Sequence, residues 1–253
     1  MATYYISTTG NDSNDGLTVS TPWKTINKII TSIFSPGDEV LLKRGDVFSL
    51  LAGETLHTDF QGVEGLPITF GAYGTGENPI ISGFETITGW TSYGDGIYYK
   101  DVSSDAQDQY TDIYIVTVDG VNTPMGRYPK TEWLTYDHAD YDGNYYFTDT
   151  NLPAGDWVGA DAVMHKVRWM VDRNRVVSQS AGRINYTVGS NWQPVNGYGY
   201  YFQHSLNCLT QLGDWFYTGT RLYMYFGAVD PSTKIVKLSV RNIGIQIYYK
   251  QYQ

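Results

Sequence analysis

The sequence predicts a mainly β protein. In it, an N-terminal helix caps the first coils of a right-handed parallel β-helix, and an antiparallel, jelly-roll-like β-sandwich is inserted after those coils. Short apolar runs separated by Gly, Asn and Pro turns fill residues 1–83, longer alternating runs fill the middle, and one short alternating run follows near the end. We therefore expect a helix-capped start of the β-helix at 1–89, the sandwich at 90–240 and a return to a β-helix coil at 241–253.

The first region contains a turn, a helix and several short strands. A β-rich run at 4–7 ends at the turn 10–16, where nearly every residue accepts a positive φ or can hydrogen-bond its own backbone. Pro22 at an early position and apolar residues at helical spacing predict a helix that begins near Thr21 and ends before residues 35–38. The apolar residues are Trp23, Ile26, Ile29, Ile30 and Ile33. Short strands are expected at 39–43, 67–74 and 78–83.

The middle region predicts antiparallel strands. Asp119-Gly120 between two β-rich runs is a strong signal for a two-residue hairpin turn. Residues 162–171 alternate as one strand, and Trp169 is expected in the core because its strand face is otherwise apolar. Further strands are expected at 176–177, 183–188, 215–217, 222–226 and 235–240, and a final rung at 243–247.

Composition and charge restrict the partners. The 26 acidic and 17 basic side chains give a formal net charge of −9. This charge disfavours duplex nucleic acid and anionic lipid, because binding to phosphate needs clustered Lys and Arg. No apolar stretch approaches the length of a membrane span, so membrane insertion is not expected. A neutral or weakly charged polysaccharide or oligosaccharide fits better as a partner, and the oligomeric state is left open.

The compartment is read from two weak signals. The lone Cys208 lies between leucines and is expected to be a small buried residue, so it carries no information on disulfides. No charged-then-apolar leader precedes the first strand. An extracellular or cell-surface location is expected if a leader has been removed, and a virion is the alternative.

The N-terminal motifs resemble those of a known family. The segments that carry the resemblance are the run from Tyr4 through GNDSNDG (10–16), then PWKTI (22–26), PGDEV (36–40), PITF (67–70) and PIISG (79–83). Together they are similar to the amino end of pectin-lyase-like parallel β-helix proteins. The resemblance implies that the helix covers the open end of the first coil, and it implies little about function because that fold supports many activities.

A second, patchier resemblance covers the middle of the chain. Its segments are VDG (118–120), GRYP (126–129), GDWVGA (155–160), GDWFY (213–217) and LYMY (222–225). They look similar to bacterial β-helix glycosidases, including β-xylosidase-type enzymes, that carry a β-sandwich inserted after the first coils. In those enzymes the catalytic carboxylates lie on later coils, which this chain does not contain, so the catalytic residues remain unknown.

One segment, 133–146, has the composition of a glycan contact. Aromatic faces stack on sugar rings, while carboxylates and amides accept hydrogen bonds from sugar hydroxyls. The candidate carbohydrate-binding residues are Trp133, Tyr136, Asp137, His138, Tyr141 and Tyr145, with Trp192 in a later loop. The alternative interpretation is a polar loop whose Tyr rings pack against the sandwich.

No metal site and no cofactor are expected. Asp12, Asn14 and Asp15 are interpreted as a turn rather than a calcium loop, because no acidic residue stands at the closing position. The four His residues lack metal-ligand spacing, and phosphate-loop and nucleophile-elbow motifs are missing. Asp137, Asp140 and Asp142 are interpreted as solvated surface rather than as a hydrolytic carboxylate pair.

Three functional hypotheses follow. The leading one is a capping and glycan-binding region of a carbohydrate-active parallel β-helix protein, not catalytic by itself. The second is a glycoside hydrolase or polysaccharide lyase with its site between the sandwich and the coils. The third is a phage tail or virion-associated protein.

Overall fold

The computed structural model describes residues 1–50, 55–58, 60–102, 113–187, 189–190, 192–241 and 243–247. Among these residues the chain forms two compact units. Unit 1 contains Met1–Glu85 and the stretch from Ser239 onward, and unit 2 contains Thr86 to Leu238. The boundaries predicted after residues 89 and 240 lie a few residues further along the chain. None of the helices in the described part of the chain is long and apolar enough to cross a membrane.

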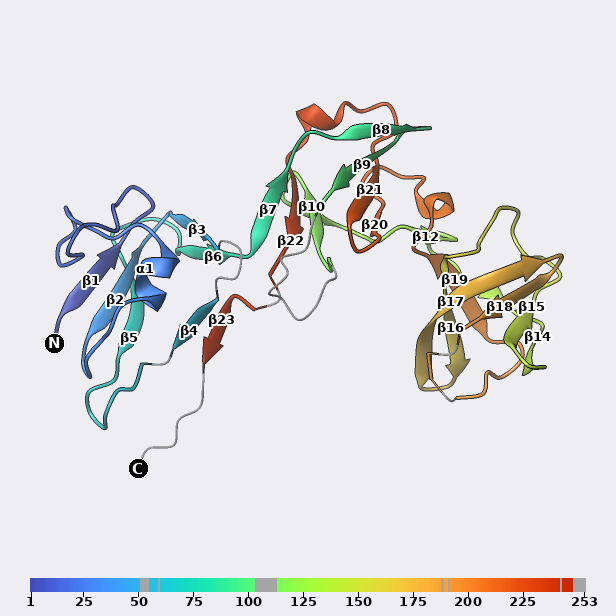
Figure 1. Cartoon of the computed structure of the whole chain (residues 1–253), viewed down its shortest axis with the longest axis horizontal. Helices are drawn as coiled ribbons and strands as arrows, with labels where there is room; N and C mark the ends of the chain where they lie inside the picture. Colours follow the sequence, from blue (N-terminus) through green and yellow to red (C-terminus); the bar gives the residue numbers. More distant parts are fainter. Residues whose placement is uncertain are drawn as a thin grey trace. The chain divides into compact units, whose positions relative to one another are not determined.

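Unit 1 is built from small parallel sheets (Figure 1). Strand β2 (Glu39–Lys43) pairs in parallel with β1 (Thr3–Ile6) and with β5 (Thr69–Tyr73). Strand β3 (Val47–Ser49) pairs with β6 (Ile80–Ser82), and β4 (Leu56–Thr58) pairs with β23 (Ile245–Ile247), both again in parallel. The predicted final strand at 243–247 therefore lies beside β4, a strand from the first sixty residues.

The helix of unit 1 is shorter than predicted. Helix α1 spans only Ile26–Ile30, and the Thr25 hydroxyl caps it by accepting a hydrogen bond from the Lys28 amide at 3.2 Å. Trp23 does not belong to the helix but forms a parallel bridge with Ile6, and its ring stacks on Tyr4 at a centroid distance of 4.8 Å. The Asp12 carboxylate accepts hydrogen bonds from the Lys24 and Thr25 amides, so the acidic turn has a structural role.

The parallel β-helix expectation is wrong as a fold assignment. The parallel sheets contain only two or three strands each, and no coiled parallel β-helix or helix cap is evident among the described residues. The pectin-lyase-like resemblance loses its structural basis for the same reason. Short apolar strands closed by Gly or Asn suit any small parallel sheet, so this pattern does not specify a solenoid.

Unit 2 contains an eight-stranded antiparallel sheet around its main core. The order is β12 (Arg127–Tyr128), β19 (Gly199–Gln203), β16 (Asp161–Val167), β17 (Met170–Ser180), β18 (Arg183–Tyr186), β15 (Tyr145–Thr148) and β14 (His138–Tyr141), and β13 (Leu134–Thr135) also pairs with β19. Only two residues separate β13 from β14, so one short segment pairs with β19 at one end and with β15 at the other. The sheet therefore curls back around its core.

Two four-stranded sheets and two short 3₁₀-helices complete unit 2. One sheet has the order β11 (Val121–Thr123), β10 (Val116–Val118), β22 (Val236–Ser239) and β7 (Phe84–Ile87). The other has the order β20 (Trp215–Tyr217), β21 (Arg221–Tyr225), β9 (Ile97–Asp101) and β8 (Thr91–Gly94). The 3₁₀-helices are η1 (Leu206–Cys208) and η2 (Pro231–Thr233). The mainly β class with antiparallel sheets is confirmed.

The Asp119-Gly120 hairpin is confirmed. Strands β10 and β11 pair with Val118 opposite Val121, and the two turn residues have φ values of 51° and 82°. Both values lie in the left-handed region that a two-residue turn of this type requires.

The prediction of one continuous strand at 162–171 is wrong. The chain turns at Arg168-Trp169, between β16 and β17, and Trp169 is 69% exposed rather than buried. No Gly, Pro, Asn or Asp marks this turn. The apolar alternation continues through it because the residues on either side lie on the same face of the paired strands.

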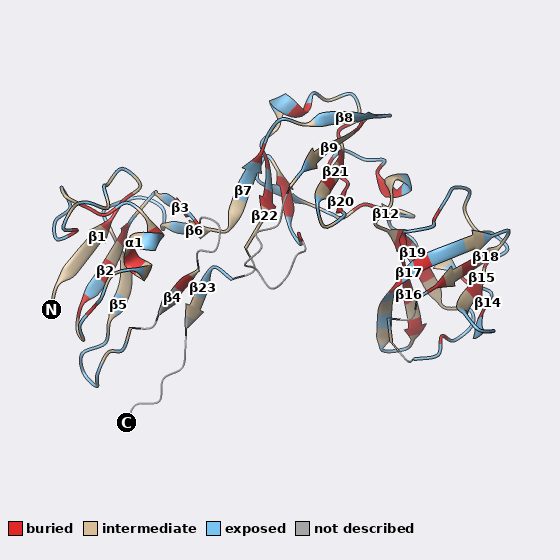
Figure 2. Cartoon of the chain, in the orientation of Figure 1, coloured by how far each residue is buried: buried red, intermediate tan, exposed pale blue. Residues whose placement is uncertain are grey.

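The core of the eight-stranded sheet is aromatic, and its buried residues gather on β16, β18 and β19 (Figure 2). The Trp157 ring stacks on Phe202 at a centroid distance of 4.1 Å, and Trp157 is 1% exposed. Cys208 is fully buried, as predicted, and burial raises the pKa of its thiol to about 12. Lys166 is also fully buried, with its ammonium 2.9 Å from an Asp172 carboxylate oxygen.

Replacement of Trp157 tests the aromatic core. We expect Trp157→Ala to lower the free energy of unfolding by about 3–5 kcal/mol, because it removes a large stacked ring and leaves a cavity. The matched control is Trp169→Ala, which should change it by no more than about 0.5 kcal/mol because the ring is exposed. Urea unfolding followed by circular dichroism measures both, and equal effects would contradict the assignment of the core.

The Lys166–Asp172 pair predicts a pH dependence. Burial is the largest influence on the Asp172 carboxyl and raises its pKa. Hydrogen bonds from Lys166, Ser190 and the Arg173 backbone, together with the Lys166 charge, outweigh burial and hold the pKa below its ordinary value. The stabilisation by ionised Asp172 is therefore present at neutral pH and is lost as the pH falls below about 4. We expect the difference in unfolding free energy between the wild type and a Lys166→Met, Asp172→Asn double variant to change between pH 7 and pH 3 in favour of the variant. If the difference in unfolding free energy between the two proteins does not change with pH, the Lys166–Asp172 pair does not contribute to the pH dependence of stability.

Candidate functional site

The predicted glycan-contact residues do not form one surface. Tyr136 is fully buried in the core, where its hydroxyl donates a hydrogen bond to the His165 carbonyl at 3.0 Å and burial raises its pKa. A sugar ring cannot stack on it, so its predicted role in direct contact is corrected to a packing role. Aromatic composition alone did not distinguish a ring that faces solvent from one that fills the core.

The residues on β14 and β15 divide between two faces. His138 is exposed, with Nδ1 3.1 Å from the Asn196 amide nitrogen and Nε2 3.6 Å from an Asp140 oxygen. Asp137 is exposed and accepts a hydrogen bond from the Thr150 amide at 2.7 Å. Tyr141 and Tyr145 are brought together, with ring centroids 4.8 Å apart, but Tyr145 packs against the core cluster.

The two predicted tryptophans lie elsewhere. Trp133 is 44% exposed and packs edge-on against Tyr201 at 4.9 Å. Trp192 is 47% exposed and lies edge-on to Trp169 at 5.7 Å. Glycan contact by Trp133, Asp137, His138, Tyr141, Tyr145 and Trp192 stays a prediction.

The structure contains a cavity that the sequence did not predict, which we call the Asp161 cavity. Its volume is about 700 Å³, within the range of small-molecule sites. The lining comes from unit 2 and consists of Ile113, Tyr114, Thr123, Pro124, Met125, Asp161, Arg173, Arg175, Thr187, Gln203, His204, Trp215, Tyr217, Thr218 and Gly219. It combines aromatic rings, hydroxyl and amide groups, and a cluster of charges.

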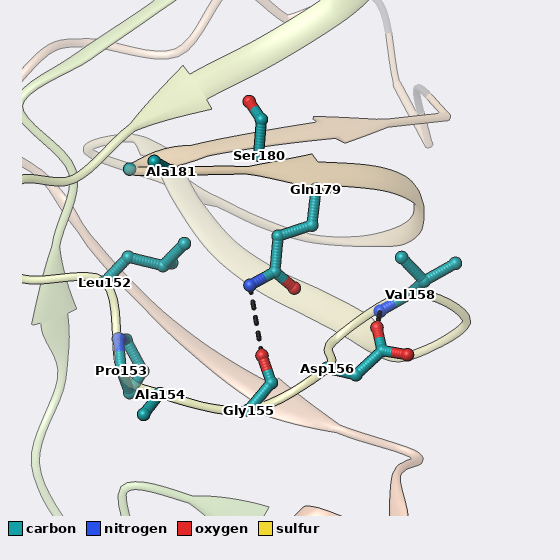
Figure 3. A pocket seen from close by; sticks show the side chains of 10 residues that line it. Leu152, Pro153, Ala154, Gly155, Asp156, Val158, Gln179, Ser180 and Ala181 are labelled. Carbon is teal, nitrogen blue, oxygen red and sulfur yellow. Dashed lines mark hydrogen bonds between the residues drawn. The ribbon is translucent and has the colours of Figure 1, made fainter.

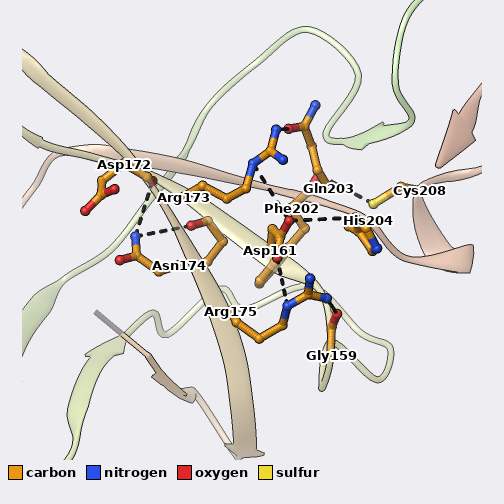
Figure 4. Close-up of polar contacts among 11 residues, drawn as sticks. Gly159, Asp161, Asp172, Arg173, Asn174, Arg175, Phe202, Gln203, His204 and Cys208 are labelled. Atoms are coloured by element: carbon orange, nitrogen blue, oxygen red, sulfur yellow. Dashed lines mark hydrogen bonds and ion pairs between the residues drawn. The ribbon is translucent and has the colours of Figure 1, made fainter. Parts of the chain in front are cut away.

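Strand register brings these charges together (Figure 4). Asp161 on β16 lies opposite Arg175 on β17 and opposite Gln203 on β19. Arg173 is two residues from Arg175, so both arginines point to the same face of β17. Asp172 and Asn174 point to the other face, as Figure 4 shows.

Asp161 is the centre of the charge cluster. It is 4% exposed, and one carboxylate oxygen lies 3.0 Å from Nε of Arg175. The other oxygen lies 3.8 Å from Nε of Arg173 and 3.8 Å from Nδ1 of His204. The carboxylate thus balances one positive charge of the cavity and fixes the positions of the groups around it.

His204 reaches the cluster through an unusual backbone conformation. Its φ of 59° lies in the left-handed region, which non-glycine residues adopt rarely. His204 follows directly after β19, and the centroid of its ring lies 5.2 Å from that of the Phe216 ring. Strain of this kind persists only where the surroundings hold it, and it is concentrated at functional sites.

Aromatic side chains form another part of the lining. Trp215 is buried, and its indole N–H donates a hydrogen bond to the Thr123 carbonyl at 3.0 Å. Tyr114 is 62% exposed, so its ring is accessible to a ligand.

Unit 2 contains two other hollows. One, of about 460 Å³, is lined by 152–156, Val158 and 179–182 (Figure 3). Its Gln179 is already committed, because its amide donates to the Gly155 carbonyl and accepts from the Trp157 amide. The other, of about 480 Å³, lies around Trp90, Tyr98, Asp230 and Lys234.

The described residues give the Asp161 cavity one carboxylate. This is Asp161, whereas glycoside hydrolysis by the common mechanisms needs two carboxyl groups about 5–9.5 Å apart. No cluster of three or more His, Cys, Asp or Glu residues suited to a metal ion is found in the described part of the chain. The arrangement offers charged, hydrogen-bonding and aromatic groups to a polar ligand.

Sequence reasoning missed this cavity although a signal was present. The pattern Arg173-Asn174-Arg175 places two arginines on one strand face. Recognising the cavity also required the hairpin at 168–169, because only that turn sets Asp161 opposite Arg175.

Known proteins match this chain only in part. No protein-family profile matches the chain. The lacto-N-biosidase of Bifidobacterium longum is 40% identical over 86 residues, which is 32% of this chain and 5% of that enzyme. The chain therefore matches only a small fraction of its curated relative.

Solved structures give a likeness of fold. A glycoside hydrolase structure superposes with a TM-score of 0.70 at 18% identity, over 94% of this chain and 46% of that one. A lacto-N-biosidase from Eubacterium ramulus is 38% identical over 42% of this chain and 15% of its own, but its TM-score of 0.29 supports no argument about fold.

These neighbours correct the family resemblance drawn from the sequence. The sequence and structural neighbours are glycoside hydrolases, and no pectin-lyase-like β-helix fold is shown. The chain covers less than half of the glycoside hydrolase structure whose fold it shares.

Replacement of Asp161 tests the charge cluster. We expect Asp161→Asn to lower the free energy of unfolding by about 1–2 kcal/mol, since the buried carboxylate is lost while the partly exposed arginines regain water. The control is Asp140→Asn, in which a 56% exposed carboxylate is removed and the change should stay within about 0.5 kcal/mol. Chemical denaturation at neutral pH measures both. If Asp161→Asn unfolds with the same free energy as the wild type, the ion pairs of Asp161 do not stabilise the cavity.

Proposed function

We propose that this chain is a glycan-binding, non-catalytic region of a carbohydrate-active protein and that the Asp161 cavity receives the sugar. The observation that carries the proposal is the make-up of this cavity. Its volume suits one or two sugar rings, and its lining mixes aromatic faces with hydrogen-bonding groups. Sugar recognition needs both, because a pyranose presents C–H faces and a ring of hydroxyls.

Binding without cleavage is favoured by the charges. The one carboxylate that the described residues contribute to the lining, Asp161, is engaged by Arg175 at 3.0 Å. It is therefore poorly suited to act as a nucleophile or a general base. The likeness to a lacto-N-biosidase and to a glycoside hydrolase supports a carbohydrate ligand. We propose that the parent protein is a glycoside hydrolase and that it acts outside the cell or at its surface.

The alternatives stand as outcomes of the test. A glycoside hydrolase within this chain would need a pair of carboxyl groups, whereas a polysaccharide lyase would reveal itself by new reducing ends in a reducing-sugar assay. The virion hypothesis receives no support from the glycoside hydrolase neighbours. Among the residues first predicted to contact glycan, Trp133 and Trp192 have exposed rings and stay as auxiliary candidates.

A glycan array combined with a reducing-sugar assay tests this function. We expect retention of at least one glycan class and no release of reducing ends. Tyr114→Ala should weaken binding about tenfold, which corresponds to about 1.4 kcal/mol, because the accessible ring of the cavity is lost.

The matched control is Tyr141→Ala, which removes a ring of similar exposure from the predicted segment 133–146. It should leave binding unchanged. Loss of binding in Tyr141→Ala but not in Tyr114→Ala would move the site to that segment. Release of sugar would contradict the non-catalytic assignment, and retention of no glycan would contradict the function itself.

A further inference from the structure

The Asp161 cavity carries a surplus of positive charge. Among the residues that the structure describes, two arginines line it against one carboxylate, and His204 adds a group that can become cationic. This local balance is the opposite of that of the chain, whose formal net charge is −9. A long-range attraction to anions therefore does not arise from the protein as a whole, and any preference for an anionic ligand must be local to the cavity.

The two arginines differ in how fully their donors are used. Arg175 is committed, since Nε is 3.0 Å from Asp161 and Nη1 donates to the Gly159 carbonyl. Nε of Arg173 stands 3.8 Å from Asp161, and Nη2 is 3.5 Å from the Gln203 side-chain oxygen. Both distances of Arg173 lie at or beyond the limit of a hydrogen bond. A guanidinium has five N–H donors, so within the described residues Arg173 keeps donors for a ligand.

Arg173 is also held where a ligand can reach it. Its side chain is 52% exposed and lines the cavity, while the nearby carboxylate of Asp161 restrains its orientation. A planar guanidinium binds a carboxylate or sulfate group through two parallel hydrogen bonds, which are stronger than those to a neutral hydroxyl.

We infer that the Asp161 cavity selects glycans that carry an anionic group, a sugar carboxylate or a sulfate ester, and that Arg173 binds this group. The inference rests on the proposed function, because it names the ligand class of the same cavity. Cationic sugars are excluded from this role, since Asp161 is already paired with Arg175.

Matched pairs of ligands test the inference. We would titrate the protein by isothermal calorimetry with oligogalacturonides and their methyl esters, and with a sulfated galactan and its desulfated form. We expect roughly tenfold tighter binding of the anionic member of at least one pair, and a loss of that preference as NaCl rises from low to high concentration. The carboxylate and sulfate pairs show which anion is recognised.

Arg173→Gln should reduce the preference to less than about twofold, because binding of the anionic member weakens more than binding of the neutral one. Arg173→Lys retains the charge but not the paired donors, so an intermediate preference is expected. Arg183→Gln is the control, because Arg183 is paired with Asp142 and stacked over Tyr146, outside the cavity lining. A thermal melt of each variant verifies folding, and the salt dependence of the wild type tests the inference even where a variant does not fold.

The outcomes separate this inference from the proposed function. Equal affinity for both members of both pairs would overturn the anion preference and leave glycan binding intact. A preference that persists in Arg173→Gln would overturn the assignment to Arg173. Failure to bind any member of either pair would overturn the anion preference, and failure across the whole glycan array would overturn the proposed function as well.

Discussion

The antiparallel register of β16 with β17 and β19 is the constraint on which the candidate site depends. It sets Asp161 opposite both Arg175 and Gln203, and the pleat then brings Arg173 to the same face. A shift of one residue in β16 would turn Asp161 into the aromatic core, and the same shift in β17 would turn Arg173 and Arg175 away from the cavity. The core on the opposite face, with Trp157 stacked on Phe202, makes such a shift costly.

The same register explains how a nearly buried carboxylate is tolerated. Burial of an unpaired charge is strongly unfavourable, but Arg175 lies within hydrogen-bond distance of Asp161, and Arg173 adds positive charge nearby. Because the arginines stay partly exposed, their attraction to Asp161 is moderate and one of them keeps donors for a ligand. Structural support and ligand selection thus arise from one cluster.

The sequence predicted individual elements better than their assembly. Asp119-Gly120 carries its own turn signal, and the strands at 215–217 and 222–226 follow from β-rich composition, so these predictions succeeded. The prediction of a parallel β-helix failed because short apolar strands do not specify how many strands a parallel sheet will contain. The prediction that Trp169 is buried failed because Arg168-Trp169 forms a turn that contains none of the usual turn residues.

The Asp161 cavity was not predictable from composition, since its residues lie far apart in the chain and meet only through strand pairing. Tyr136 shows the converse error, because a ring in an aromatic-rich segment filled the core instead of facing solvent.

A crystal structure with a bound oligogalacturonide is the most direct measurement of the central claim. The account predicts an intact sugar in the Asp161 cavity, one ring against Tyr114 and a carboxylate within hydrogen-bond distance of the Arg173 guanidinium. An ordered sugar on Trp133, Tyr141 or Trp192 with the cavity left unoccupied would contradict it, as would a cleaved product in the cavity.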